Sequence, residues 1–232
     1  MSEQAESQII RLQRRLDVIL QPDGLPALHL NPAQQLQFRQ YLQLLLQWNQ
    51  RIDLISPGDE SRIAERHILE SLAVLSVWPF RSGALVIDLG SGAGFPGIPL
   101  KIMRPDLVVT LLESKQKKAL FLNTVVRELK LSDCRVVNAR AEEVADFSQK
   151  QFSIVIARAV AELKKLWKWS QPLLVDGGVL LAMKGGDLEN ELQALKKFDS
   201  RVFYQLRYYP SEWRVDPARC LVIVATDMKS LK

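Results

Sequence analysis

The sequence predicts an α/β fold: a mostly parallel, seven-stranded sheet with an antiparallel edge hairpin, preceded by a helical N-terminal extension. Residues 1–83 carry apolar side chains at helical spacing, whereas from residue 84 short β-branched runs alternate with helix-length segments. The last two β-branched runs have no helix-length segment between them, which indicates a hairpin. We therefore expect a helical extension over 1–83 and an α/β domain over 84–232.

Two helices are expected in the extension. Asn31 and Pro32 form a typical helix start, an N-cap followed by proline, ahead of apolar residues that run from Leu36 to Trp48. A second helix is expected from Glu60 to Val77, because the Trp78-Pro79 pair disfavours helical backbone.

The remaining elements follow from the alternation of β-branched and helical patterns. The parallel strands are expected at Ala84–Leu89, Leu107–Leu112, Arg135–Asn138, Phe152–Ala157 and Gly178–Met183, and the hairpin strands at Val202–Tyr208 and Cys220–Thr226. Helices are expected at Lys115–Lys130, Glu162–Leu174 and Leu188–Phe198.

Composition predicts a soluble, cytoplasmic protein. Of the 232 residues, 47% are hydrophobic and 25% charged, which is ordinary for a globular chain. No apolar run approaches the roughly 18 residues of a membrane span, and the first residues do not resemble a signal peptide. Cys134 and Cys220 cannot form a disulfide framework and show no metal-ligand spacing. The net charge of +5 arises after residue 83, which suggests a polyanionic partner, although many basic proteins bind none.

A glycine-rich loop follows the first strand. Gly90, Gly92 and Gly94 stand at alternate positions, where they allow a tight turn and close approach of a ligand. Gly92, Gly94 and Gly97 also fit the G-x-G-x-x-G pattern of dinucleotide sites, so a nicotinamide-dependent oxidoreductase is one alternative.

Electrostatics favours a different ligand for this loop. We expect the carboxylate of Asp88, two residues before Gly90, to face the ligand and repel a pyrophosphate by several kcal/mol. S-adenosylmethionine carries an ammonium and a sulfonium and no phosphate, so the same carboxylate would attract it. The loop therefore indicates a methyl donor.

Acidic residues after the next two strands complete the expected donor site. Glu113 ends the second strand and would accept hydrogen bonds from the ribose hydroxyls, or would serve as an acid at the start of the following helix. Ala141 and Glu142 follow the third strand and would frame the adenine, although Glu142 also suits a solvated helix start.

The end of the fourth strand lacks the usual groups for activating an acceptor. The Ile154–Ala159 segment contains no Asn/Asp-Pro-Pro-aromatic motif and no cysteine, and His29 and His67 both lie in the helical region. The ring nitrogen at position 7 of guanine has a free lone pair and needs no deprotonation, so positioning alone would suffice and no dedicated catalytic residue is expected. Arg158 is the best candidate beside the acceptor; it would bind the donor carboxylate or an RNA phosphate, or form a structural ion pair.

Two aromatic-basic segments are candidates for RNA contact. The first holds Lys164, Lys165, Trp167 and Lys168, and the second runs from Tyr208 to Arg214 between the hairpin strands. Aromatic side chains stack on splayed bases and lysines contact the backbone of single-stranded RNA. Trp167 suits the helix core equally well, with the lysines on a solvated face.

At these residues the chain resembles the ribosomal RNA small-subunit methyltransferase G family, also called the GidB family. The similarity runs from about Trp48 to the end of the chain. It is carried by the segments Arg66–Ser71, Gly90–Leu100, Leu112–Ser114 with Lys117 and Lys118, Ala157–Ala159 and Met183–Gly185. The chain departs from the family pattern at Asp53, Ile55 and Ala157.

The resemblance implies a Rossmann-like class I methyltransferase fold. It also implies methyl transfer from S-adenosylmethionine to the ring nitrogen at position 7 of a guanine, in a decoding-region loop of 16S rRNA. Donor-binding positions carried over are Gly90, Phe95, Ala141, Glu142 and Arg158, and Lys184 of the Met183–Gly185 motif joins the RNA-contact candidates. We expect 16S rRNA or the small subunit as the partner, no metal, no membrane association and a monomer. The alternatives are an inactive RNA-binding assembly factor and a small-molecule methyltransferase.

Overall fold

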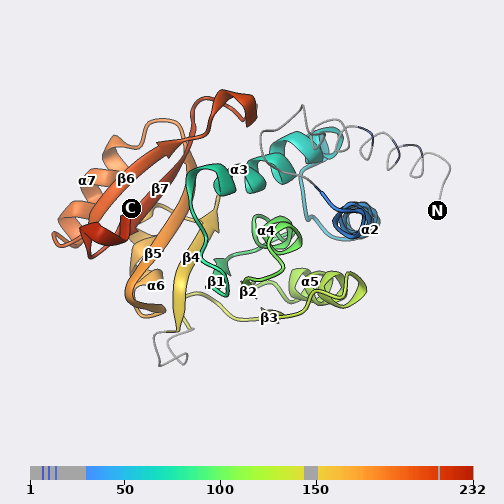
Figure 1. Ribbon diagram of the computed structural model, residues 1–232, viewed down its shortest axis with the longest axis horizontal. Helices are drawn as coiled ribbons and strands as arrows, with labels where there is room; N and C mark the ends of the chain where they lie inside the picture. The colour runs from blue at the N-terminus through green and yellow to red at the C-terminus, as the bar shows by residue number, and fades with distance from the viewer. Residues whose placement is uncertain are drawn as a thin grey trace.

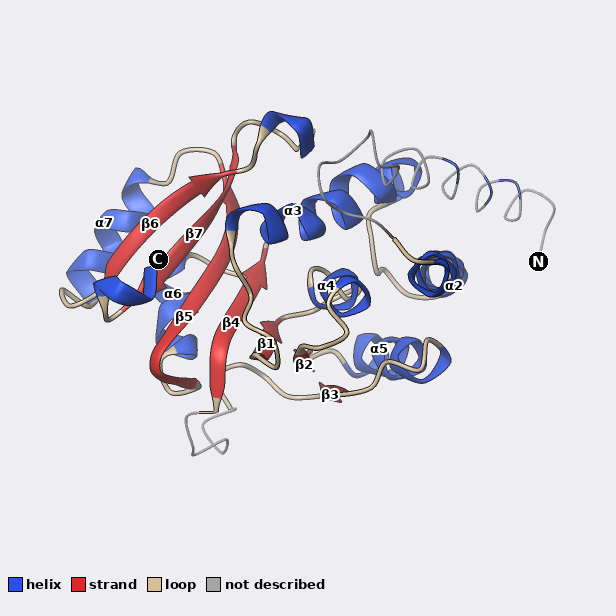
Figure 2. Ribbon diagram, in the orientation of Figure 1, coloured by secondary structure: helices blue, strands red, loops and turns tan. Residues whose placement is uncertain are grey.

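A computed structural model describes residues 30–143, 151–213 and 215–231, together with Ser7, Ile10 and Arg14. Within these residues seven strands form one sheet: β1 (Leu85–Leu89), β2 (Val108–Leu112), β3 (Cys134–Val137), β4 (Phe152–Arg158), β5 (Leu174–Gly185), β6 (Phe203–Tyr208) and β7 (Arg219–Ala225). The strand order is β3-β2-β1-β4-β5-β7-β6. Figures 1 and 2 show this sheet between two layers of helices.

The pairing of the strands confirms the expected topology. Strands β1 to β5 run parallel to one another, whereas β7 is antiparallel to both β5 and β6. The last two strands therefore form the edge hairpin that the sequence predicts. Strand β5 starts four residues earlier than expected, at Leu174, because Leu174 pairs with Phe152 across a register irregularity.

The first described helix, α2 (Pro32–Asn49), begins where the sequence predicts. The Asn31 side chain accepts from the Gln34 backbone N–H, and the Gln34 side chain accepts from the Asn31 backbone N–H. This reciprocal capping box satisfies two backbone donors that would otherwise lack partners. The buried face of α2 consists of Phe38, Tyr41, Leu42, Leu45 and Leu46.

The prediction of one helix over residues 60–77 is wrong in detail. The segment comprises the 3₁₀-helical η1 (Pro57–Arg62), the π-helical η2 (Ala64–Leu69) and the α-helix α3 (Glu70–Val77). The buried residues explain the π turn, since the pair Ile63 and Ala64 precedes the pair Ile68 and Leu69 by five positions. A π turn closes its hydrogen bonds over five residues, so this spacing keeps both pairs on one face.

The other helices cover the two faces of the sheet. Helix α4 (Gly97–Met103), for which the sequence analysis gave no range, lies with α2, α3 and α5 (Gln116–Glu128) on one face. Helices α6 (Leu163–Ser170) and α7 (Glu189–Phe198) cover the other face (Figure 1). The short 3₁₀ turn η4 (Ser211–Trp213) lies in the connection between the two hairpin strands, and a second one, η5 (Met228–Leu231), follows β7.

Each face of the sheet has its own buried cluster. The cluster under α2, α3, α4 and α5 joins side chains of the helical extension, such as Tyr41 and Leu72, to side chains of the strands, such as Val86 and Ile156. Buried side chains from before and after residue 83 thus belong to one cluster, and the division into an extension and a domain stays a prediction. In the part of the chain that the structure describes, no helix is both long and apolar enough to cross a membrane.

Gly97 allows α4 to pack directly against the sheet. A Cβ atom at this position would lie 2.4 Å from Leu111 Cδ2 and 2.7 Å from Asp88 Oδ2. Neither atom belongs to a flexible exposed side chain, because both residues are fully buried. A glycine is therefore required where this helix begins.

We predict that Gly97→Ala lowers the free energy of unfolding by about 1–3 kcal/mol, because the added methyl overpacks the contact between α4 and β1. The matched control is Gly58→Ala, since a Cβ at Gly58 meets nothing within 4 Å. Denaturant unfolding of both variants measures the difference. Equal stability of the two variants would contradict this account of the contact.

Candidate functional site

The glycine loop lies where the carboxyl ends of β1, β2 and β4 meet. Gly90, Gly92 and Gly94 have φ angles of 68°, 57° and 99°. These left-handed conformations favour glycine, which has no Cβ to clash. Gly90 is exposed and Gly92 half-buried. A Cβ at Gly92 would meet only the Gly90 carbonyl oxygen, at 3.8 Å, so a ligand can lie directly against this backbone.

Four backbone N–H groups of the loop and of the start of α4 are bonded within the protein. Gly97 N–H donates to Asp88 Oδ2 at 3.0 Å, and Gly92 N–H donates to Glu113 Oε2 at 2.9 Å. Gly94 N–H and Phe95 N–H both donate to the carbonyl oxygen of Ser91. A pyrophosphate site needs such groups directed at the ligand. The loop therefore does not fit a dinucleotide, although its glycines match that pattern.

The prediction that the Asp88 carboxylate faces the ligand is wrong. Its side chain is completely buried, on the face of β1 that α4 covers, where it holds the Gly97 N–H. Burial raises the pKa of Asp88 from 3.8 to about 7. The carboxylate still argues against a pyrophosphate, but it does so by occupying the start of α4 rather than by repelling the ligand.

Glu113 takes one of the two roles that its position suggested, that of an acid at the start of the following helix. One carboxylate oxygen accepts from Gly92 N–H, and the other accepts from Lys115 N–H, at 2.7 Å, where α5 begins. The first bond places the carboxylate beside the glycine loop. Each carboxylate oxygen has a second lone pair, so Glu113 retains capacity for ligand hydroxyls.

Arg158, the last residue of β4, is held by side chains from the helical segment. Its guanidinium donates to His67 Nδ1 at 2.8 Å, to Glu70 Oε2 at 3.3 Å and to the Arg66 carbonyl oxygen at 3.2 Å. It also lies 5.0 Å from the centre of the Phe95 ring, on which His67 stacks. Only 13% of the Arg158 side chain is exposed. The structure thus gives this residue an ion pair, the third of the roles that the sequence allowed.

These contacts fix the protonation state of His67. Arg158 can only donate, so Nδ1 of His67 accepts and the ring proton lies on Nε2. Burial and the neighbouring Arg158 lower the pKa of His67 from 6.5 to about 4, which keeps the ring neutral. Nε2 faces Asp59 Oδ2 at 3.8 Å. The imidazole is therefore held by Arg158, with Nε2 facing Asp59 beyond hydrogen-bond distance, and is not a base of ordinary strength.

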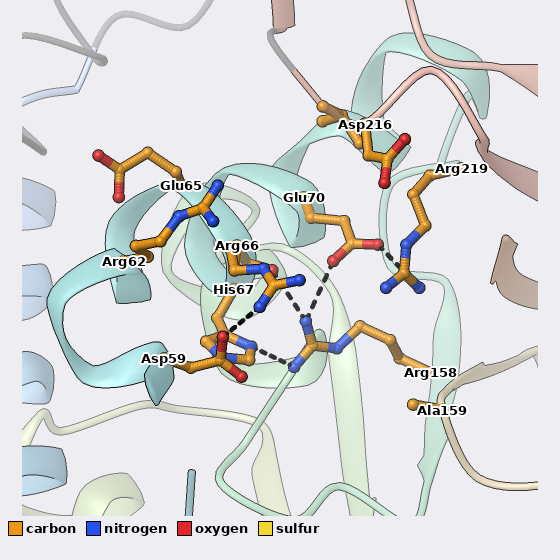
Figure 3. Close-up of a pocket in the computed structure, with 11 residues that line it drawn as sticks. Asp59, Arg62, Glu65, Arg66, His67, Glu70, Arg158, Ala159, Asp216 and Arg219 are labelled. Carbon is orange, nitrogen blue, oxygen red and sulfur yellow. Dashed lines mark hydrogen bonds and ion pairs between the residues drawn. The ribbon is translucent and has the colours of Figure 1, made fainter. Parts of the chain in front are cut away.

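A cavity of about 450 Å³ opens beside Arg158 (Figure 3). It lies between the helical segment that carries η1 and η2, the end of β4 and the start of β7. Its lining combines four arginines and four carboxylates with an imidazole and two apolar residues, namely Arg62, Arg66, Arg158, Arg219, Asp59, Glu65, Glu70, Asp216, His67, Ala159 and Val215. Asp59, Glu70 and Arg219 were not singled out by the sequence analysis, although Glu70 lies within the Arg66–Ser71 motif.

The candidates for RNA contact divide into buried and exposed residues. Trp167 is 2% exposed and donates to Asp199 Oδ2, so the prediction that it meets RNA is wrong. Leu163, Leu166, Trp167 and Ser170 form the buried face of α6, whereas Lys164, Lys165 and Lys168 are exposed. Lys184 is also largely buried, with its ammonium 2.7 Å from both Glu191 Oε2 and the Ala161 carbonyl oxygen. Arg214 lies outside the described residues.

The remaining expected donor residues lie at the same end of the sheet. Ala141 is half-buried, and Glu142 is exposed in the turn after β3. Phe95 is 3% exposed beneath His67 and Arg158, so its ring supports the site from inside. Gly90 is the exposed point of the loop.

Residues 34–206 match the family model described as rRNA small subunit methyltransferase G (GidB). The chain belongs to this family. It is 44% identical over 176 residues to the ribosomal RNA small subunit methyltransferase G of Chloroflexus aggregans, covering 75% of this chain and 72% of that protein. The protein of the same name from a Roseiflexus species is 42% identical over 193 residues, covering 81% of this chain and 82% of the relative.

Solved structures of more distant proteins share the fold of this family member. TYW2 of M. jannaschii in complex with AdoMet aligns with a TM-score of 0.53 at 18% identity, covering 75% of this chain and 77% of that one. Aeropyrum pernix fibrillarin with bound S-adenosyl-L-methionine aligns with a TM-score of 0.52 at 14% identity. The alignment covers 68% of this chain and 76% of fibrillarin. The fold is therefore the Rossmann-like class I methyltransferase fold, as expected from the sequence.

The inward position of Asp88 predicts a pH dependence of stability. Its pKa is about 7 in the folded protein and 3.8 without burial, so the folded state holds a proton that the unfolded chain releases in between. The stability that this bound proton contributes is fully present below the Asp88 pKa of the unfolded chain. It is lost as the pH rises through the Asp88 pKa of the folded protein, by on the order of 1 kcal/mol of unfolding free energy per pH unit.

Asp88→Asn removes this titration. We predict that the unfolding free energy of the wild type falls relative to that of the variant as the pH rises from about 5 to about 7. Because both proteins retain His67, its opposite titration cancels in the difference. Denaturant unfolding over this range provides the measurement. A pH-independent difference would show that Asp88 is solvated.

Proposed function

We propose that this protein transfers the methyl group of S-adenosylmethionine to the ring nitrogen at position 7 of a guanine, in a decoding-region loop of 16S rRNA. Family membership supports the coarser part, an S-adenosylmethionine-dependent rRNA methyltransferase. The choice of guanine and of position 7 is what the resemblance to this family implies, and the site is compatible with it. We place the reaction in the cytoplasm, on 16S rRNA or the small subunit, and expect a monomer.

The observation that carries the choice of atom is the state of His67, which removes the imidazole, although not the four carboxylates of the lining, as a base. Among the described residues that line the cavity it is the one imidazole, and its pKa of about 4 and its bond from Arg158 leave Nδ1 unable to take a proton from an acceptor. An exocyclic amine or a hydroxyl would have to lose a proton when it is methylated. The nitrogen at position 7 already carries a lone pair, so it reacts without a base.

The residues at the glycine loop fit S-adenosylmethionine. The exposed backbone at Gly90 and the open space at Gly92 would receive the methionyl part, and Gly94 shapes the turn. Glu113 would accept from the ribose hydroxyls through its remaining lone pairs, and Ala141 and Glu142 would border the adenine. When bound, S-adenosylmethionine supplies an electrophilic methyl group.

The chain itself contributes orientation. The lone pair of the guanine nitrogen forms the new bond to the methyl carbon as the carbon–sulfur bond breaks, and the electron pair of that bond stays on sulfur. Arg158 lies between the Phe95 ring of the glycine loop and the cavity, so it borders both halves of the site. Holding two reactants in line in this way supplies much of the rate enhancement of such a transfer.

Contacts to the rest of the RNA are proposed for the exposed lysines of α6. Lys164 and Lys165 lie in its first turn, just after the end of β4, and Lys168 follows one turn later. Their ammonium groups are available to phosphates in a way that the ammonium of Lys184 is not, because Lys184 is paired with Glu191. Electrostatic contacts of this kind weaken as the salt concentration rises.

We predict that Gly92→Asp abolishes donor binding. The new carboxylate would lie beside Glu113, which already accepts from the Gly92 backbone, and would repel it while filling the open space of the loop. S-adenosylhomocysteine should stabilise the wild type by about 2–3 kcal/mol at 100 times its Kd and leave the variant unchanged in a thermal shift assay.

The matched control for Gly92→Asp is Gly83→Asp. Gly83 has a similar φ of 71° and open space around it, but it lies before β1 and away from the loop. This variant should respond to S-adenosylhomocysteine as the wild type does. Stabilisation of the wild type by NAD, and not by S-adenosylhomocysteine, would contradict the assignment of the donor.

The reaction itself is tested by mass spectrometry of rRNA. A strain that lacks the gene should lack a single 7-methylguanosine in 16S rRNA, and the wild-type gene should restore it. We expect Arg158→Ala not to restore it, because the variant loses the contacts to Phe95, His67 and Glu70 at once. Unchanged 7-methylguanosine in the deletion strain would refute the proposed function and would favour an RNA-binding assembly factor.

A further inference from the structure

The cavity beside Arg158 is balanced in charge. Its four guanidinium groups are matched by four carboxylates, and His67 is neutral because its pKa is about 4. A site for an RNA phosphate would instead present an excess of positive charge, and here a phosphate would meet carboxylates at short range. The cavity therefore suits a neutral, polar group that both donates and accepts hydrogen bonds.

Glu70 occupies the centre of this lining (Figure 3). It is the first residue of α3 and is 7% exposed. Its Oε2 lies 3.3 Å from Arg158 Nη1 and its Oε1 lies 3.6 Å from Arg219 Nη1. Charge-assisted hydrogen bonds are normally shorter, about 2.7–2.9 Å. The carboxylate is thus held in place by two cations and keeps lone pairs for further donors.

Guanine is the base whose donors match such a carboxylate. Its Watson–Crick edge presents N1–H and the exocyclic amine side by side, whereas adenine presents an acceptor at N1. Enzymes that modify a base commonly flip it into a pocket and recognise that edge by hydrogen bonds. The nitrogen at position 7 lies on the opposite edge of the purine, so recognition of the Watson–Crick edge leaves it free to react.

We propose that the cavity between η1, η2, β4 and β7 receives the flipped guanine and that both oxygens of Glu70 accept from its N1–H and exocyclic amine. This assignment rests on the proposed function. Arg158 and Arg219 hold the carboxylate in position from β4 and β7. Because Arg158 also lies on Phe95, the bound purine is placed next to the glycine loop.

The test replaces the target guanosine of 16S RNA by inosine, which lacks the exocyclic amine. The modified RNA is made by ligating a synthetic oligonucleotide, and methyl transfer from labelled S-adenosylmethionine is measured on both RNAs. Dimethyl sulfate, which methylates the same nitrogen without an enzyme, gives the intrinsic reactivity ratio. Beyond that ratio we expect the wild type to favour guanosine by about 10- to 100-fold, the effect of one charge-assisted hydrogen bond.

The variant Glu70→Gln separates recognition from a structural role of the ion pairs. Its guanosine preference should fall to within about threefold of the dimethyl sulfate ratio, since a neutral amide accepts more weakly than a carboxylate. The control is Glu128→Gln, an exposed glutamate on α5 that should keep the wild-type preference. Stabilisation of both variants by S-adenosylhomocysteine reports an intact donor site. A structural defect alone would lower the rate on both RNAs equally and would leave the ratio unchanged.

Two results would overturn the assignment, and they can be distinguished by whether methyl transfer still occurs. Wild-type enzyme that methylates inosine and guanosine RNA in the dimethyl sulfate ratio overturns the role of Glu70 and leaves the proposed function intact. This result needs no variant, so it decides the question even if Glu70→Gln fails to fold. Absence of methyl transfer to either RNA overturns the proposed function and the pocket together.

Discussion

The buried guanidinium of Arg158 is the constraint on which the arrangement of the site depends. A cation removed from water at the end of a strand must recover its solvation from fixed partners, and removing one partner of such a pair is costly. Arg158 finds its partners in Arg66, His67 and Glu70, about ninety residues earlier in the chain. The helical segment is therefore held against the carboxyl end of β4, and the cavity forms between them.

Hydrogen bonds within the protein also determine which groups the glycine loop presents to a ligand. The sequence places two acids near the ligand, and both accept hydrogen bonds from backbone N–H groups of the protein. Asp88 accepts from Gly97 N–H, and Glu113 accepts from Gly92 N–H. A loop held in this way presents bare backbone and carboxylate lone pairs to a ligand rather than a ring of N–H donors. That surface suits a phosphate-free, positively charged donor, and it excludes a dinucleotide for a different reason from the one that sequence suggests.

The sequence predicted the sheet, its edge hairpin and the start of α2 because each has a local signal: alternation, the missing crossover and the Asn31-Pro32 cap. It failed where the decisive contact is distant in the chain. The direction of Asp88 depends on α4 packing over β1, and the pairing of Arg158 with His67 joins residues 91 positions apart. Trp167 was predictable, since Leu163, Leu166 and Ser170 share its face of α6. The five-residue spacing of Ile63 and Ile68 likewise marks the π turn.

A charge-balanced cavity also suits the course of the proposed reaction. Methyl transfer moves one positive charge from the sulfonium to the purine, so the charge of the reacting pair stays the same while its position changes. A strongly acidic pocket would retain the cationic product, and a strongly basic one would repel the donor that must lie beside it. With Arg158 and Arg219 on either side of Glu70, the lining offers a carboxylate to the purine without an excess of negative charge. Positioning then carries the catalysis.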